Sequence, residues 1–181
     1  MPHKDKKNVW PRATQSWERI HVDFFDFENK IYILMVDAYL KWVEYEEVMG
    51  LTTQVVVKTL KNLWARFGVA RTIVYDGGPA FISEQFKMFC VETGVKHISA
   101  AISSQFKWTD GEDGVNCQKL VKKIKVWRWE IWITVSYYNN SRKEEEQSPA
   151  EKFLGRRTRI LLDLLKPKLH QEVEREIMER P

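Results

Sequence analysis

The sequence predicts an α/β fold, a mixed five-stranded sheet flanked by helices. Five short apolar or alternating runs suit β-strands, and two amphipathic runs with capping residues separate the later ones. The chain has 181 residues, of which 44% are hydrophobic, so it fits one domain with a buried core. The expected order through this core is β-β-β-α-β-α-β.

Three strands are expected first along the chain. Residues 19–22 are a strand-forming run that ends just before Asp23. Residues 30–37 contain a continuous apolar run, which is typical of a strand covered on both faces. Residues 42–48 suit a strand paired beside it.

Two helices alternate with the remaining strands. The first, over residues 53–67, has apolar residues at steps of three and four, and Gly68 follows as a C-terminal cap. Residues 71–75 are the next strand and end before Asp76. Ser83 caps the second helix, which buries Cys90, and residues 95–100 return as a strand.

The C-terminal part carries one clear helix signal and one ambiguous segment. Ser148, Pro149 and Glu151 are a cap serine, a first-turn proline and a third-position glutamate, so a short helix is expected to begin there and end at Gly155. Residues 126–137 alternate as a strand does, but Trp132 interrupts the polar face, so helix and strand both remain open. Residues 142–147 are a charged run expected to form a solvated loop.

Composition limits the classes of function. Lys and Arg number 29 against 25 Asp and Glu, a net charge of +4 that permits an anionic partner without requiring one. No apolar run approaches the ~20 residues of a membrane span, and the N-terminus is polar and basic, so we expect a soluble intracellular protein, nuclear or cytoplasmic and not secreted. Two cysteines and four scattered histidines cannot assemble a zinc module.

Asp23 and Asp76 each follow a strand-forming run. Carboxylates are hard ligands suited to magnesium or manganese, and rigidly held pairs can bind two ions ~3.5–4 Å apart. Such ions activate an attacking oxygen and stabilise the leaving one in a phosphodiester displacement. The alternative interpretation is an ordinary turn aspartate in each case.

Four motifs in order resemble those of a known family. Residues 17–24, 36–42 and 76–81 are similar to consecutive signatures of the retroviral-type integrase catalytic core. Residues 148–157 resemble the version carried by gypsy-type LTR retrotransposons. The resemblance covers roughly residues 10–167, at near-family spacing.

The resemblance implies an RNase H-like catalytic core over residues 16–160, preceded by a lead segment (1–15) and followed by a charged, helical tail (161–181). It also implies three acids that bind two Mg²⁺ or Mn²⁺ ions. Such integrases trim the ends of element DNA and join the new 3′-hydroxyls to target DNA, without a covalent nucleophile from the protein. Asp23 matches the first acid and Asp76 the second.

The resemblance implies the partners as well. DNA is expected, both element ends and target, and a homodimer is allowed, whereas neither a membrane nor a small-molecule substrate is implied. The family's usual Asp-Asn-Gly-Pro has Gly77 in place of asparagine, and Leu40 stands where serine is common. The zinc-binding N-terminal domain and C-terminal barrel of full integrases are not recognisable in the chain.

The third acid is the main departure from the family pattern. The family interval of about thirty-six residues from Asp76 reaches Glu112, whereas anchoring on Leu120 puts Gly114 at the catalytic position and Asn116 points to Asp113. Glu112 is therefore the candidate third ligand, with Asp113 as its neighbour alternative. If neither serves, the chain is a catalytically inactive, integrase-derived module for nucleic-acid binding or interaction.

A basic stripe follows the third motif and is a candidate DNA contact. Phosphate neutralisation is one use for such a stripe, and a solvated helix face is the other interpretation. The residues concerned are Lys119, Lys122, Lys123 and Lys125, with Arg128 beyond them.

Overall fold

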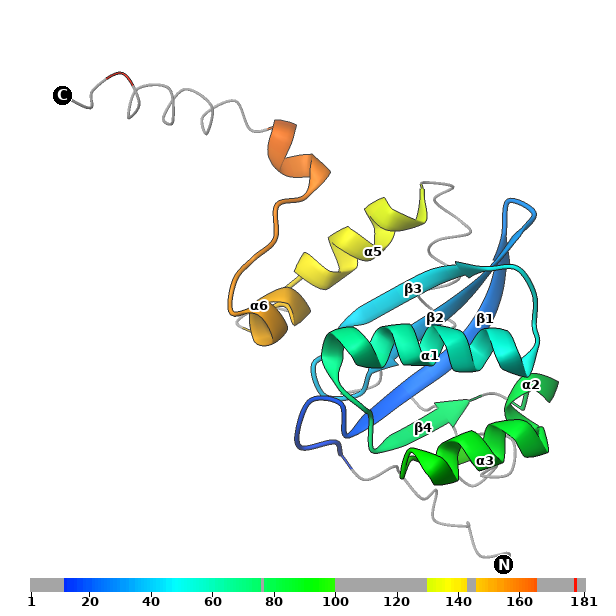
Figure 1. Ribbon diagram of the computed structural model, residues 1–181. Coiled ribbons are helices and arrows are strands. Elements are labelled where there is room, and N and C mark those ends of the chain that lie inside the picture. Colours follow the sequence, from blue (N-terminus) through cyan, green and yellow to red (C-terminus); the bar gives the residue numbers. More distant parts are fainter. Residues whose placement is uncertain (1–11, 76, 100–129, 143–145, 166–177, 179–181) are drawn as a thin grey trace, which may run out of the picture. The chain divides into compact units, whose positions relative to one another are not determined.

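The computed structural model describes residues 12–75, 77–99, 130–142, 146–165 and 178. The chain divides into two compact units, Met1–Arg128 and Trp129–Pro181. Each unit is taken by itself below, with its elements labelled as in Figure 1. Within the described residues, no helix is long and apolar enough to cross a membrane.

The N-terminal unit contains a five-stranded sheet in the order β3-β2-β1-β4-β5. Strands β1, β2 and β3 pair antiparallel, whereas β4 pairs parallel with β1 and β5 pairs parallel with β4. The mixed α/β fold predicted from the sequence is therefore confirmed. The strands are β1 (Arg19–Phe27), β2 (Lys30–Asp37), β3 (Val43–Val48), β4 (Thr72–Tyr75) and β5 (Lys96–Ser99).

The first strand is longer than its sequence pattern indicated. The prediction that the strand ends before Asp23 is wrong, because β1 continues through Asp23 to Phe27. Three more aromatic residues continue the strand, and each position pairs with β2 up to Phe27 opposite Lys30. Glu28 (φ 49°) and Asn29 (φ 62°) then close the hairpin with two left-handed residues, as tight hairpin turns require.

The helices of this unit begin and end where capping chemistry directs. In α1 (Thr53–Phe67), the Thr52 hydroxyl accepts the N–H of Val55, and the Gly68 N–H donates to the Trp64 carbonyl at 2.8 Å. In α3 (Glu84–Glu92), the Ser83 hydroxyl accepts the N–H of Phe86 at 3.1 Å. Both helices confirm the prediction. A short helix, α2 (Pro79–Ile82), begins with proline and was not predicted.

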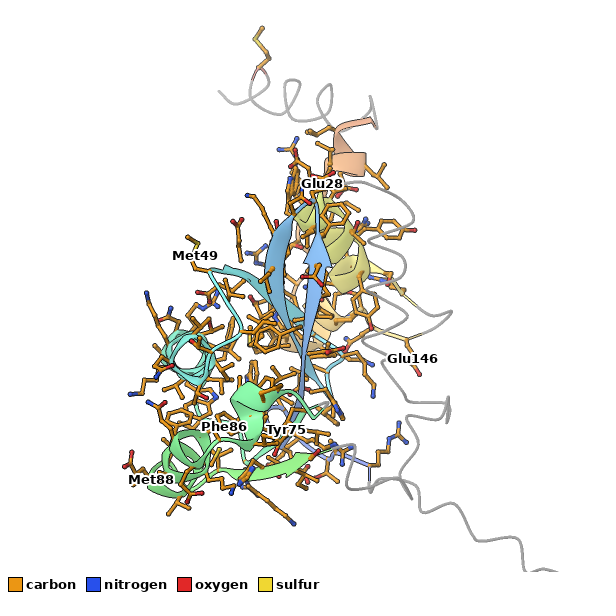
Figure 2. The ribbon with its side chains drawn as sticks, turned by 90° about the vertical axis from the view of Figure 1, so that its right-hand side faces the viewer. Glu28, Met49, Tyr75, Phe86, Met88 and Glu146 are labelled. Atoms are coloured by element: carbon orange, nitrogen blue, oxygen red, sulfur yellow. The ribbon has the colours of Figure 1, made fainter. Side chains whose placement is uncertain are left out.

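The three helices described in this unit pack on one face of the sheet, as Figures 1 and 2 show from two directions. Leu60 and Leu63 of α1 are fully buried, and Trp64 stacks on Phe89 of α3 with 5.2 Å between ring centroids. Cys90, predicted to lie in the core, is 1% exposed. This apolar layer holds the helices against the central strands.

The C-terminal unit contains α5 (Ile131–Asn140), α6 (Pro149–Leu154) and a 3₁₀ turn, η1 (Leu161–Leu165). The segment left open as helix or strand is helical from Ile131, with residues 126–129 outside the described part. Four of its buried residues recur at helical steps, namely Ile131, Thr134, Val135 and Asn139, and Asn140 at its end is buried as well. The predicted capping box of Ser148 and Glu151 is present in α6, and Gly155 ends that helix at φ 69°.

Candidate active site

Asp23 lies at the middle of the central strand β1. Its neighbour Phe24 points toward the helices, with its ring 5.5 Å from that of Phe81 in α2. Because side chains alternate along a strand, Asp23 projects from the opposite face of the sheet, where it is half-buried. Strands on both sides of β1 restrain its backbone, with Leu34 of β2 as the partner of Asp23.

The residues two positions away share this face with Asp23. Phe25 stacks on Tyr32 at 5.3 Å between centroids. Burial, together with the positive charges of Arg19 and Lys41, lowers the pKa of His21 to about 3. His21 is therefore uncharged at neutral pH, and its imidazole does not add a positive charge beside Asp23.

The second predicted acid follows strand β4 directly in the sequence. The parallel register pairs His21 with Val74 and Val22 with Tyr75, the last residue of β4. Asp76 itself lies outside the described residues. Its two chain neighbours, Tyr75 and Gly77, are described and limit where its backbone can lie.

Tyr75 is held on the helix side by aromatic contacts. Its ring stacks on Phe81 at 5.0 Å between centroids and meets Phe86 edge-on, and Figure 2 labels both Tyr75 and Phe86 beside α3. The hydroxyl lies 3.3 Å from Nδ1 of His97 in β5. These contacts fix the backbone immediately before Asp76 and, through Phe81, the helix that follows it.

Gly77 explains one departure from the family motif. Its backbone has φ 41°, a left-handed conformation that glycine adopts without a steric cost. Asparagine is among the few other residues that visit this region routinely. The glycine found here and the asparagine usual in the family are therefore both residues that can adopt the backbone conformation seen at Gly77.

The structure describes only part of the predicted site. Of the predicted ligands, Asp23 is described, and its hard carboxylate oxygens on a restrained strand suit a magnesium or manganese ion. Within the described residues, no group of three His, Cys, Asp or Glu side chains is close enough to hold a metal. The other predicted ligands and DNA contacts lie outside the described part and stay predictions: Asp76, Glu112, Asp113, Lys119, Lys122, Lys123, Lys125 and Arg128.

Asp37 is a structurally important carboxylate that the sequence did not single out. It is 1% exposed and accepts three backbone N–H groups, from Trp17 at 2.6 Å, Tyr39 at 2.8 Å and Leu40 at 2.6 Å. Burial raises the pKa of Asp37, and the three donors oppose that rise. Asp37 thus joins the segment before β1 to the turn after β2. The sequence signal that could have indicated this role is an aspartate at the end of an apolar strand.

Comparison with known proteins defines the class of protein to which the chain belongs. The model of the integrase core domain family matches residues 13–104, and the chain belongs to that family. Members of the family generally depend on divalent metal ions, and the family implies binding of DNA. The match ends before Glu112, so it leaves the third acid untested.

Two individual proteins extend this assignment. The chain is 28% identical over 185 residues to the uncharacterized protein K02A2.6 of Caenorhabditis elegans, in an alignment that covers 92% of the chain and 14% of that protein. The crystal structure of the catalytic core domain of BIV integrase is 16% identical, with a TM-score of 0.59, and covers 76% of this chain and 94% of that one. The second likeness shows that the fold is that of an integrase catalytic core, which is RNase H-like.

Proposed function

We propose that this integrase core binds DNA and joins DNA 3′ ends to target DNA by two-metal phosphodiester transfer. In this proposal, Asp23, Asp76 and Glu112 bind two Mg²⁺ or Mn²⁺ ions. The observation that carries the proposal is the parallel pairing of Val22 with Tyr75. Each of these residues directly precedes one of the first two acids in the sequence.

The pairing supports a shared site because neighbouring strands run ~4.8 Å apart and paired residues project to the same face. We propose that the register continues for one residue, with Asp76 beside Asp23. Consecutive Cα atoms are ~3.8 Å apart, so Asp76 cannot be far from the restrained Tyr75. Two carboxylates at that separation can bridge ions that are ~3.5–4 Å apart.

The ions, when bound, would polarise the phosphodiester and stabilise the charge on the attacking and leaving oxygens. The chain itself contributes placement. Asp23 is restrained by its pairing with Leu34 of β2 and by the pairing of β1 with β4 up to the preceding Val22. The backbone before Asp76 is held by the contacts of Tyr75 with Phe81 and His97. No covalent nucleophile from the protein is required.

The third acid decides between strand transfer and binding alone. The family interval favours Glu112, and Asp113 is its alternative. A chain without a third ligand would keep DNA binding and lose the chemistry, as an inactive integrase-derived module. In either case, we propose that residues 16–160 form the core and that Lys119, Lys122, Lys123 and Lys125 contact DNA phosphates.

Strand transfer and nicking in the presence of manganese test the proposal. The wild type is expected to form product, and Asp76→Asn and Glu112→Gln are expected to lose it by about a thousandfold, the equivalent of ~4 kcal/mol of transition-state stabilisation. Asp113→Asn is the matched control for loss of a neighbouring charge. Titration of Mn²⁺ by calorimetry on the same variants measures metal binding, and circular dichroism shows separately whether each variant is folded.

The possible results have distinct meanings. Equal signals from the wild type and Asp76→Asn would end the case for catalysis. Loss in Asp113→Asn with retention in Glu112→Gln would assign the third ligand to Asp113. Retained, salt-sensitive DNA binding without any product would leave the inactive module as the function.

A further inference from the structure

The loop between α6 and η1 presents three arginines in four positions. Arg156, Arg157 and Arg159 are all exposed. The motif that resembles gypsy-type integrases, residues 148–157, ends within this loop, and neither the predicted acids nor the predicted lysine stripe includes the loop. All of its described contacts lie within the C-terminal unit.

Two of these arginines lack an acidic partner among the described residues. Arg157 pairs with Asp163 at 3.3 Å, and Lys152 pairs with Glu146 at 3.6 Å. Glu151 of α6 is occupied by Arg142, whose Nε donates to it at 3.0 Å. The described acids of this unit that lie near the loop are therefore already paired, and none of them compensates the charges of Arg156 and Arg159.

The backbone of this loop is fixed at three points. At its start, the N–H of Gly155 donates to the Glu151 carbonyl at 3.0 Å. At its centre, Asn140 of α5 donates through Nδ2 to the Thr158 hydroxyl at 2.7 Å, and Oδ1 accepts the Thr158 N–H at 2.9 Å. At its end, the N–H of Ile160 donates to Asp163 at 3.0 Å.

This arrangement suits a polyanion. Holding like charges close together costs free energy unless an anion offsets the repulsion. The planar guanidinium group presents a rigid fork of donors that matches phosphate oxygens. Because Asn140 and Thr158 already fix the loop, less conformational entropy is lost when the two arginines bind.

We propose that Arg156 and Arg159 bind phosphates of the DNA backbone, as contacts additional to those proposed for the acidic residues and the lysine stripe. The inference rests on the proposed function in one respect, since DNA is taken as the polyanion. It does not require metal or catalysis, because arginine binds phosphate directly. Asn140 and Thr158 are the positioning residues for these contacts.

The test compares two variants of the full chain that lose the same charge. Arg156→Gln with Arg159→Gln removes the proposed contacts. Lys58→Gln with Lys61→Gln is the matched control, since these exposed lysines lie on α1, across the sheet from Asp23. Fluorescence anisotropy with a labelled DNA duplex measures affinity from about 50 to about 200 mM NaCl, with EDTA present throughout.

Each phosphate contact contributes about 0.9 to the slope of log affinity against log salt. The arginine variant is therefore expected to have a slope that is smaller in magnitude by about 1.8. Between the two salt concentrations, the factor by which its affinity falls is then about twelve times smaller than the factor for the wild type. The lysine control is expected to keep the wild-type slope. Circular dichroism confirms that both variants are folded.

An arginine variant with the wild-type slope would overturn the inference, as would a control that changes by the same amount. If such a variant still performs strand transfer, only this inference fails and the proposed function stands. Absence of DNA binding by the wild type at low salt would overturn both. Arginine-dependent binding that persists in inactive Asp76→Asn would support the arginine contacts independently of catalysis.

Discussion

Replacing Asp37 by asparagine is expected to detach the segment before β1 from the turn after β2. Oδ2 of the carboxylate accepts the backbone N–H of Trp17, and Oδ1 accepts the backbone N–H groups of Tyr39 and Leu40. Asparagine has a single acceptor oxygen, which can keep the two turn bonds only if its NH₂ group faces the Trp17 N–H. The lost bond to a buried, charged acceptor is expected to cost about 1–3 kcal/mol.

Amide hydrogen exchange resolves this effect residue by residue. Because the chain has two compact units, exchange at these amides reports on the N-terminal unit alone. The Trp17 amide is expected to exchange about 5- to 150-fold faster in Asp37→Asn, the range that corresponds to about 1–3 kcal/mol. The amides of Tyr39 and Leu40 are expected to change much less.

Asp26→Asn is the matched control, because Asp26 is an exposed carboxylate on β1 and loses the same charge. Its variant is expected to leave all three amides unchanged. Equal acceleration at Trp17, Tyr39 and Leu40 in Asp37→Asn would mean that the whole unit was destabilised. That result, or an unchanged Trp17 amide, would refute the assignment of separate roles to the two carboxylate oxygens.

Three further outcomes are expected. Leu63 is 0% exposed, so Leu63→Ala should lower the free energy of unfolding, measured in urea, by about 2–5 kcal/mol. Leu51 is 53% exposed, so Leu51→Ala should leave it nearly unchanged. Similar losses in the two variants would contradict the packing of α1. Hydrogen bonds from Ser148 and Arg142 lower the pKa of Glu151 from 4.5 to about 2, so its stabilisation is complete above pH 4.5 and is lost as pH falls towards 2. Acid unfolding followed by circular dichroism should show this dependence in the wild type, and Glu151→Gln with the same profile would rule it out. Cys90 is 1% exposed and burial raises its pKa to about 11, so in a Cys117→Ser variant a thiol reagent should label Cys90 only in urea. Rapid labelling of that variant in its native state would disprove the burial of Cys90.

Local chemistry accounts for the elements that the sequence predicted accurately. The bounds of α1 and α6 follow from caps that act over a few residues, such as Ser148 with Glu151 and the closing Gly155. The end of β1 depends instead on pairing with β2, which a local pattern does not contain. Helix α5 was ambiguous because its tryptophan-rich alternation suits a strand, and burial of every third or fourth residue decided the outcome.

The sequence by itself determined the family and predicted the two aspartates that we propose begin its site, because ordered motifs and strand-forming runs are written along the chain. Only the tertiary structure decided that Asp23 lies within a strand and opposite the helices, since strand pairing and the packing of Phe24 set that face. It also decided that Asp37 is a structural ligand of three amides and that Arg156 and Arg159 stand on a fixed loop. Those roles depend on groups distant in sequence, such as Trp17 for Asp37 and Asn140 for Thr158, which only folding brings within hydrogen-bonding distance.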